Sequence, residues 1–165
     1  MNFKISCLVF IHNHNGEILL LKRNKPPNLG FWSPPGGKLE MSRGESPFEC
    51  VRREAFEETG LSLENKDLSL FGYVSEKAYE QKNHWLMFLF HSKKRIDFKP
   101  NDIDEGTFAF FKRETVENLA IPTTDHELIW PFYDKRSDGF WGVSADCGGG
   151  KLKIKIEATP LKDDN

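Results

Sequence analysis

Short runs in which apolar and polar residues alternate dominate the chain, and this pattern is typical of β-strands. Strands are expected over residues 5–11 and 17–21, because both runs flank Asn13-His14-Asn15-Gly16, a sequence that favours a hairpin turn. Further predicted strands cover residues 68–75, 85–91, 108–112, 140–145 and 151–156. In the last run lysine alternates strictly with leucine or isoleucine, which predicts a half-buried strand.

One segment between these strands has the signals of a well-bounded helix over residues 47–59. Ser46 suits the N-cap, Pro47 suits the first helical position, and Gly60 suits the left-handed residue that ends a helix. Glu49 completes a capping box with Ser46. The stripe predicted to be buried consists of Phe48, Val51 and Ala55. Two short helices are expected further along, over residues 115–119 and 125–133.

Three glutamates lie on one face of the predicted helix, close to its end. Glu54, Glu57 and Glu58 stand at i, i+3 and i+4, where helical side chains are neighbours. Their like charges repel one another, and the negative end of the helix dipole adds to the repulsion. A hard divalent cation with oxygen ligands, Mg2+ or Mn2+, would remove this instability. The alternative is a solvated acidic face that binds nothing.

The loop before the helix favours a metal site over that alternative. It contains Pro34-Pro35-Gly36-Gly37-Lys38. Glycines permit positive φ angles and allow the backbone to approach a ligand closely. A helix that only presents charges to water does not require such a loop.

Composition and net charge indicate a folded, single-domain protein that does not bind nucleic acid stably. A chain of 165 residues predicts one domain, residues 1–165, and a composition with 38% hydrophobic and 13% aromatic residues is that of a folded protein. The net charge of −2 argues against stable binding of nucleic acid. The phosphates of a substrate would instead meet a bound metal and a few local cations, of which Arg23, Lys25 and Lys38 are the nearest to the glycine loop.

The number of cysteines and the length of the apolar runs indicate the cellular compartment in which the protein is expected. Cys7, Cys50 and Cys147 are few, odd in number and widely separated, which argues against a disulfide framework or a zinc site. A reducing cytoplasm is therefore expected. The first residues lack the features of a cleavable leader, and no apolar run has the length of a membrane span, so no membrane association is expected.

The segment from Gly37 to Leu61 resembles the signature of Nudix hydrolases, Gly-x5-Glu-x7-Arg-Glu-U-x-Glu-Glu-x-Gly-U, in which U is aliphatic. Every fixed position from Glu45 onward is met. Between Gly37 and Glu45 there are seven residues instead of five. We interpret this as a two-residue insertion, in which Met41-Ser42-Arg43 occupies the place where one residue is usual. The resemblance implies an α/β fold, the Nudix-type alpha/beta/alpha sandwich with a mixed β-sheet.

The resemblance also implies roles for the residues of this segment. Glu54, Glu57 and Glu58 would hold Mg2+ or Mn2+ together with the carbonyl of Gly36, and one of the glutamates would serve instead as general base. Arg53 is expected to orient Glu57 through an i, i+4 pair. The remaining assignments are Glu45 as a residue that supports the metal ligands, and Gly37 and Lys38 as contacts to the substrate.

A further carboxylate is expected from outside the signature. Glu105 lies in Asp104-Glu105-Gly106, just before an aromatic strand, and this segment is similar to one that supplies a catalytic carboxylate in MutT-type members. The alternative is a solvated loop acid. A calcium loop is excluded, because the spacing of ligands around Gly106 is wrong for an EF-hand.

Three features concern the substrate. The stretch from Arg23 to Trp32 and the stretch around Asp125 resemble oxidised-purine nucleoside triphosphatases of the 8-oxo-dGTP diphosphatase type, in which an aspartate at the second stretch binds the purine edge. For Asp125, a helix N-cap is the alternative role. Ser33 departs from that subgroup, which has an asparagine near this position, and a hydroxyl cannot reproduce the paired donor and acceptor of an amide. The aromatic residues proposed to stack on a base are Phe31, Trp32, Trp85 and Trp130.

Together these observations predict a Mg2+-dependent nucleoside triphosphate pyrophosphohydrolase that releases a nucleoside monophosphate and pyrophosphate in nucleotide-pool housecleaning. The first alternative is a Nudix hydrolase of another nucleoside diphosphate-linked substrate, such as ADP-ribose, a dinucleoside polyphosphate or capped RNA. The second is a Nudix-fold binding module without catalysis. The protein is expected to be a monomer or a homodimer.

Overall fold

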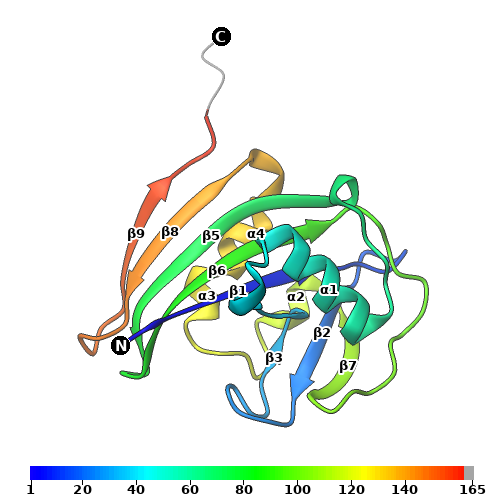
Figure 1. The fold of residues 1–165 in the computed structure, drawn as a ribbon, viewed down its shortest axis with the longest axis horizontal. Helices are drawn as coiled ribbons and strands as arrows, with labels where there is room; N and C mark the ends of the chain where they lie inside the picture. The colour runs from blue at the N-terminus through cyan, green and yellow to red at the C-terminus, as the bar shows by residue number, and fades with distance from the viewer. Residues whose placement is uncertain (162–165) are drawn as a thin grey trace.

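The computed structural model describes residues 1–161 and consists of two β-sheets and four α-helices (Figure 1). The larger sheet has six strands in the order β4-β1-β6-β5-β8-β9. Their bounds are Gly36–Lys38, Phe3–Phe10, Asn83–Ser92, Leu68–Tyr79, Trp141–Asp146 and Lys153–Ala158. The smaller sheet has the order β3-β2-β7, with bounds Trp32–Ser33, Ile18–Arg23 and Gly106–Phe111. The helices are α1 (Pro47–Thr59), α2 (Arg113–Val116), α3 (Asp125–Leu128) and α4 (Trp130–Asp134).

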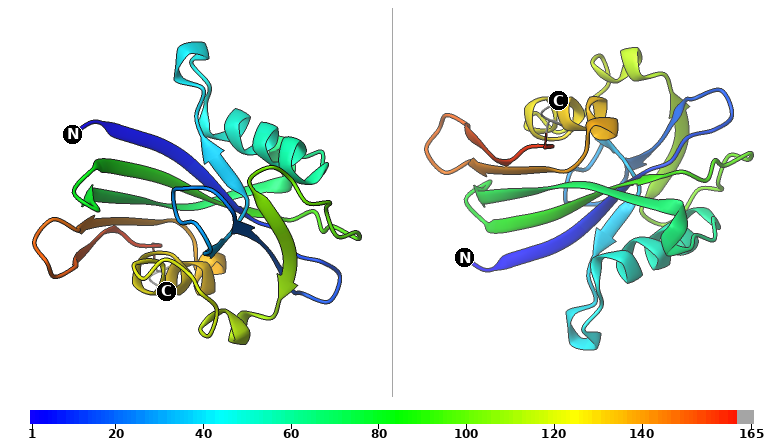
Figure 2. Two further views of the ribbon diagram at one scale, coloured as in Figure 1. Left: turned by 90° about the horizontal axis from the view of Figure 1, so that it is seen from below. Right: turned by 90° about the horizontal axis from the view of Figure 1, so that it is seen from above.

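The six-stranded sheet is mixed and is covered by helices on both faces. Strand β1 pairs with β6 in parallel, as β5 does with β8, while the other pairs are antiparallel. Helix α1 lies on one side of the sheet, and α3 and α4 lie on the other (Figure 2). Because successive side chains of a strand point to opposite faces, neighbours on β1 enter different cores: Val9 joins the cluster under α1, and Phe10 joins the cluster that contains Trp130. The predicted sandwich with a mixed sheet is confirmed.

Helix α1 has the predicted bounds because both of its ends are capped as expected. The Ser46 hydroxyl accepts a hydrogen bond from the amide of Glu49 at 3.2 Å. At the other end Gly60 has a φ of 79°, and its amide donates to the carbonyl of Phe56 at 2.9 Å. Val51 and Ala55 are fully buried, while Phe48 is half-buried against the ring of Phe90.

Two predictions about the later part of the chain are wrong. The helix expected over residues 125–133 divides into α3 and α4, because Pro131 lacks the amide that would continue the hydrogen-bond ladder. The last strand, β9, was expected to be half-buried, yet Ile154 and Ile156 are 40% and 48% exposed. Strand β9 is an edge strand, so its alternation of lysine and isoleucine does not correspond to a buried face.

Two of the cysteines that are widely separated in the sequence lie next to each other in the fold. The Sγ atoms of Cys7 on β1 and Cys50 on α1 are 3.1 Å apart, and both thiols are free and buried. Both also approach the carbonyl of Gly37, at 3.8 and 3.6 Å. The pairing of β1 with β4 brings Cys7 to Gly37, and the packing of α1 on β1 brings Cys50 to Cys7, which their distance in sequence does not indicate.

Candidate active site

A cavity of about 300 Å3 lies on the face of the large sheet opposite α1 and reaches the end of that helix through the glycine loop. One end is lined by glycines and acidic residues, with cations at its rim. These residues are Arg23, Ser33, Gly36, Gly37, Lys38, Glu54, Glu58 and Glu105. The other end is lined by Asn28, Glu76, Tyr79, Trp85, Met87, Thr124, Asp125 and Ile129. The predicted metal-binding segment and the predicted substrate-binding segment therefore open into the same cavity.

The glycine loop lies directly against the carboxylates of α1. The amide of Gly36 donates to Oε2 of Glu58 at 3.4 Å. A Cβ atom added to Gly37 would lie 2.3 Å from Oε1 of Glu54, so a larger residue there would displace that carboxylate. Gly36 has a φ of 159° and its added Cβ would lie 2.0 Å from the carbonyl oxygen of Cys7. Close packing of β4 on β1 thus requires Gly36, and Gly37 leaves room for the Glu54 carboxylate.

Two carboxyls of α1 lie in surroundings that disfavour their charged form. Burial, and next the charge of Glu54, raises the pKa of Glu58 to about 8, and the charge of Glu105 adds to this effect. Burial also raises the pKa of Glu54 against the opposing effect of Arg53. Among residues 1–161, no basic side chain forms an ion pair with Glu58 or Glu105.

The donor chemistry at this end fits a hard divalent cation. Carboxylate oxygens are the donors that Mg2+ and Mn2+ prefer, and a cation between Glu54, Glu58 and Glu105 would relieve their repulsion. As the side chains of residues 1–161 are placed, no three His, Cys, Asp or Glu residues already enclose a metal position. Glu54 and Glu58 are the residues that would hold the ion, with Gly36 beside them.

Arg53 connects helix α1 to Glu45, which lies just before the helix. Its Nε and Nη2 donate to the two carboxylate oxygens of Glu45 at 2.7 and 2.8 Å, a bidentate pair that holds the pKa of Glu45 down to about 2. Its Nη1 donates to Glu54 at 3.0 Å and to Glu57 at 3.2 Å. The predicted pair between Arg53 and Glu57 is present, but the shorter bonds go to Glu45. Arg53 therefore fixes the position of Glu54 relative to the loop.

The two-residue insertion does not disturb this arrangement. Residues Met41–Arg43 form a single 3-10 turn that ends at Gly44, whose φ is 62°. The amide of Glu40 donates to the carboxylate of Glu45 at 3.1 Å, and the amide of Glu45 donates to the carbonyl of Glu40 at 3.3 Å. These bonds close the base of the loop, which projects from the body of the molecule beside α1 (Figure 2). The insertion is accommodated outside the cavity.

Some predicted site residues lie outside the cavity. Glu57 is exposed and bonds only to Arg53 among the contacts of residues 1–161. The amide of Trp32 donates to the carbonyl of Ala120 at 2.8 Å, and its ring packs on Phe111 with centroids 4.8 Å apart. Trp130 is 1% exposed in the core, so the prediction that it stacks on a base is wrong. Among the four aromatic residues proposed to stack, Trp85 lines the cavity.

The second end of the cavity contains two carboxyls, of which Glu76 is buried and Asp125 is half-buried. The N-cap of α3 is Thr124, and Asp125 is its first residue and makes no capping hydrogen bond, so the alternative role of Asp125 as N-cap is wrong. Burial, together with the charge of Glu76, raises the pKa of Asp125 to about 8. Glu76 itself is 4% exposed, and burial raises its pKa to about 7.

Sequence reasoning missed Glu76 because the strand was expected to end at residue 75. The strand continues to Tyr79, and Val74 and Glu76 share its buried face. A glutamate two residues after a buried apolar residue of the strand is the signal that identifies it. Its neighbours Ser75 and Lys77 point to the opposite face of β5.

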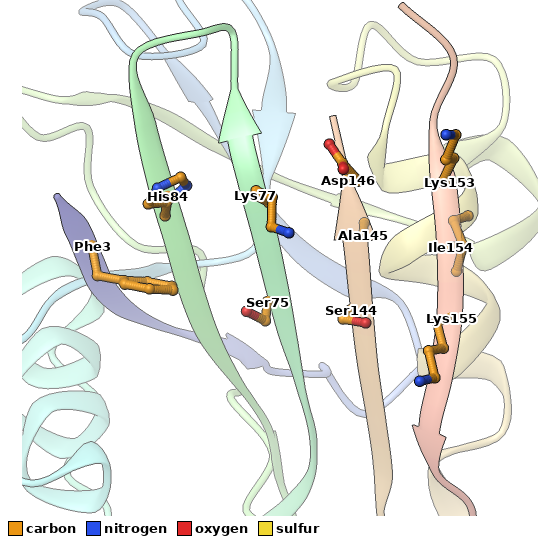
Figure 3. Close-up of a pocket in the computed structure, with 10 residues that line it drawn as sticks. All are labelled: Phe3, Ser75, Lys77, His84, Ser144, Ala145, Asp146, Lys153, Ile154 and Lys155. Carbon is orange, nitrogen blue, oxygen red and sulfur yellow. The ribbon is translucent and has the colours of Figure 1, made fainter. Parts of the chain in front are cut away.

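That opposite face has a second cavity, of about 350 Å3 (Figure 3). Figure 3 shows Lys77 on β5, His84 on β6 and Lys153 on β9 along its floor, with Phe3 at one side. Asp146 is the single carboxylate in its lining. With one carboxylate and no glycine loop, this basic surface lacks the donors that the first cavity brings together.

Comparison with known proteins agrees with the geometry. The sequence pattern of the NUDIX domain matches residues 2–140. The chain belongs to this family and is a Nudix hydrolase. In residues 1–161 no helix has both the length and the apolar character needed to cross a membrane.

Several relatives of this Nudix hydrolase are known. It is 29% identical over 114 residues to an uncharacterised Nudix hydrolase of Bacillus subtilis, covering 68% of this chain and 69% of the relative. It is 33% identical over 129 residues to an ADP-ribose pyrophosphatase of Methanocaldococcus jannaschii, covering 76% and 70%. Its structure resembles that of a MutT protein from Bacillus halodurans with a TM-score of 0.73, at 26% identity over 95% of this chain and 99% of that one.

Proposed function

We propose that this Nudix hydrolase cleaves a phosphoric anhydride bond of a nucleoside triphosphate, with Mg2+ or Mn2+, and releases a nucleoside monophosphate and pyrophosphate. The observation that carries the proposal is that one cavity joins the carboxylates of α1 to a pocket lined by Trp85, Met87 and the carboxyls of Glu76 and Asp125. One elongated ligand with phosphates at one end and a base at the other fits this division.

The residues at the acidic end have distinct tasks in this proposal. Glu54 and Glu58 would hold a divalent cation, which would screen negative charge and activate water. Arg53 holds Glu54 in place through the hydrogen bond at 3.0 Å. Glu105 is exposed, lines the cavity and faces Glu58, so it is placed to accept a proton from the attacking water. Arg23 and Lys38 line the same end and bind phosphate oxygens.

The oxidised-purine specificity needs a separate argument. Ser33 lines the cavity. The 8-oxo-dGTP diphosphatases that this chain resembles have an asparagine near this position. The hydroxyl of serine offers fewer hydrogen bonds than the amide of asparagine. We therefore propose a nucleoside triphosphatase that accepts a range of NTPs and dNTPs, with oxidised purines such as 8-oxo-dGTP among them. Asp125, which lines the cavity and has no capping role, contacts the base.

A second candidate function is hydrolysis of ADP-ribose or another nucleoside diphosphate linked to a sugar. The similarity to an ADP-ribose pyrophosphatase, 33% over 76% of this chain, favours it. Against it, the proline expected some fifteen residues after the signature in ADP-ribose hydrolases is absent, since residues 75–77 are Ser75, Glu76 and Lys77.

A panel of substrates separates these candidates. Purified protein with Mg2+ is incubated with normal and oxidised NTPs and dNTPs, ADP-ribose, diadenosine polyphosphates and capped RNA, and the products are separated by chromatography. A Glu58→Gln preparation controls for contaminating enzymes. The proposal predicts that a triphosphate yields monophosphate and pyrophosphate with the highest kcat/KM. Preferential conversion of ADP-ribose to AMP and ribose phosphate would establish the second candidate.

A further inference from the structure

Glu76 is a carboxylic acid in a place where strand packing does not require one. It lies on β5, in the centre of the larger sheet, and faces the cavity with 4% of its surface exposed. Its neighbour on the same face, Val74, is a fully buried apolar residue. An apolar residue at this position would extend the core without burying a polar group.

The protein gives Glu76 almost no compensation for its burial. Its one side-chain contact among residues 1–161 is a long one, from the Cys147 thiol to Oε2 at 3.9 Å, and a thiol is a weak donor. No basic side chain of the described chain forms an ion pair with it. The titratable groups around it are Asp125 from α3, Cys147 after β8 and Tyr79 at the end of β5, and none of these is a cation at neutral pH.

We propose that Glu76, together with Asp125, is a specificity-determining pair that binds the amino-bearing edge of the substrate's nucleobase. This inference rests on the proposed function, since it assigns the nucleobase to the end of the cavity that lies away from the phosphate-binding residues. A buried carboxyl whose one protein donor is a weakly donating thiol gains stronger hydrogen bonds when a ligand supplies donors.

The position of the pair suits a base rather than a phosphate. Strand β4, which contains Gly36 and Gly37, is separated from β5 by β1 and β6. Three strand spacings of roughly 4.8 Å place Glu76 about 14 Å from the glycine loop across the sheet. Negative charge at Glu76 would repel phosphate, while the apolar walls made by Trp85, Met87 and Ile129 suit a planar base.

The chemistry of two adjacent carboxyls selects for amino groups. Two like charges in a buried site disfavour joint ionisation, and burial raises the pKa of both groups. One member of the pair therefore retains a proton near neutral pH, and the pair presents several acceptors and a single donor. Cytosine, adenine and guanine offer exocyclic amino donors, whereas uracil and hypoxanthine present a carbonyl oxygen or a hydrogen atom at the same positions.

Binding of nucleoside monophosphates tests the proposal without relying on hydrolysis. Dissociation constants are measured by calorimetry for CMP against UMP, and for AMP and GMP against IMP. The proteins compared are the native chain, Glu76→Gln and Glu80→Gln. Glu80 is an exposed residue at the tip of the same hairpin and does not line the cavity, so it is the matched control.

The expected result is at least tenfold tighter binding of the amino-bearing member in one or more pairs by the native chain and by Glu80→Gln. In Glu76→Gln that preference falls to threefold or less, because an amide replaces one acceptor with a donor. Asp125→Asn is expected to reduce the preference independently, which covers the case in which Glu76→Gln does not fold.

Two results would overturn the proposal. One is the absence of any preference in the native chain, or a preference that both substitutions leave intact. The other is an equal loss of affinity for both members of every pair, which would indicate a contact to the sugar or a packing role. Preference without hydrolysis of any triphosphate would uphold the base-binding pair while contradicting the proposed function, so the two failures are distinguishable.

Discussion

The two ends of the cavity are both acidic, but they differ in how the chain supplies and balances the charge. At the first end, Glu54 and Glu58 lie one helical turn apart on α1, and Arg53 and the glycine loop hold them in place. At the second end, Glu76 and Asp125 come from β5 and α3, and no basic side chain within residues 1–161 forms an ion pair with either of them. The first end is suited to a cation that the protein recruits, and the second to hydrogen-bond donors of an uncharged group.

The largest effect is expected from Glu58→Gln at the first end. Loss of this carboxylate removes a ligand of the proposed cation, so kcat should fall roughly 10²- to 10⁴-fold. The same variant should lose the rise in Tm that millimolar Mg2+ gives the native protein, because only the folded state binds the ion. Steady-state kinetics and thermal unfolding with and without EDTA measure both effects. Retention of native kcat, with circular dichroism confirming the fold, would contradict the assignment.

A smaller loss of activity is expected from Glu105→Gln. Glu105 is exposed and acts only on the proton in this account, so kcat should fall about 10²-fold while Tm stays within about 2 °C. The neighbouring exposed residue Asp104 does not line the cavity, and Asp104→Asn is the matched control. Equal kcat values for the two variants would show that Glu105 is a solvated loop acid.

Arg53→Lys tests whether geometry as well as charge matters at the first end. Lysine keeps the positive charge but cannot form the bidentate pair with Glu45 or reach Glu54 and Glu57 at the same time. Displacement of Glu54 should lower kcat about tenfold. The lost bonds should lower Tm by about 3 to 6 °C. Arg52→Lys, beside it on α1, should leave both quantities near native values; a native kcat in Arg53→Lys would contradict a positioning role.

The smallest expected effect concerns stability at the second end. The pKa of Glu76 is about 7 in the folded protein and near 4.5 when unfolded, so the native chain loses stability as pH rises between these values. Glu76→Gln has no charge to bury, and its stability relative to the native chain should increase over that range by on the order of 2 kcal/mol. Chemical unfolding at pH 5 and at pH 8.5 measures the difference. If the difference in the free energy of unfolding between Glu76→Gln and the native chain were the same at both pH values, the carboxyl of Glu76 would ionise freely.

The contrast between the two ends of the cavity also explains which features could be predicted from the sequence and which could not. Ser46, Pro47 and Gly60 determine α1 through local capping, and the spacing of Glu54 and Glu58 follows from the helix itself. These interactions lie within a few residues of one another, so they can be recognised from sequence. The proposed position of Glu105 in the cavity followed from resemblance, and the structure places it there.

The parts that were missed depend on contacts between distant segments. Glu76 acquires its role from the pairing of β5 with β6 and from the approach of α3, neither of which has a local signal. The thiols of Cys7 and Cys50 meet because α1 packs on β1. Trp130 was proposed to stack on a base, and tertiary packing buries it instead. Burial that arises from long-range pairing is not determined by residue type.

A crystal structure of the native chain with Mg2+ and a nucleoside triphosphate whose α,β-bridging oxygen is replaced by an imido group tests the central claim most directly. The account predicts that the phosphates and metal lie against Glu54 and Glu58, while the base lies between Trp85 and the pair formed by Glu76 and Asp125. A nucleotide bound with its base outside this cavity, or with its phosphates against Glu76, would contradict it.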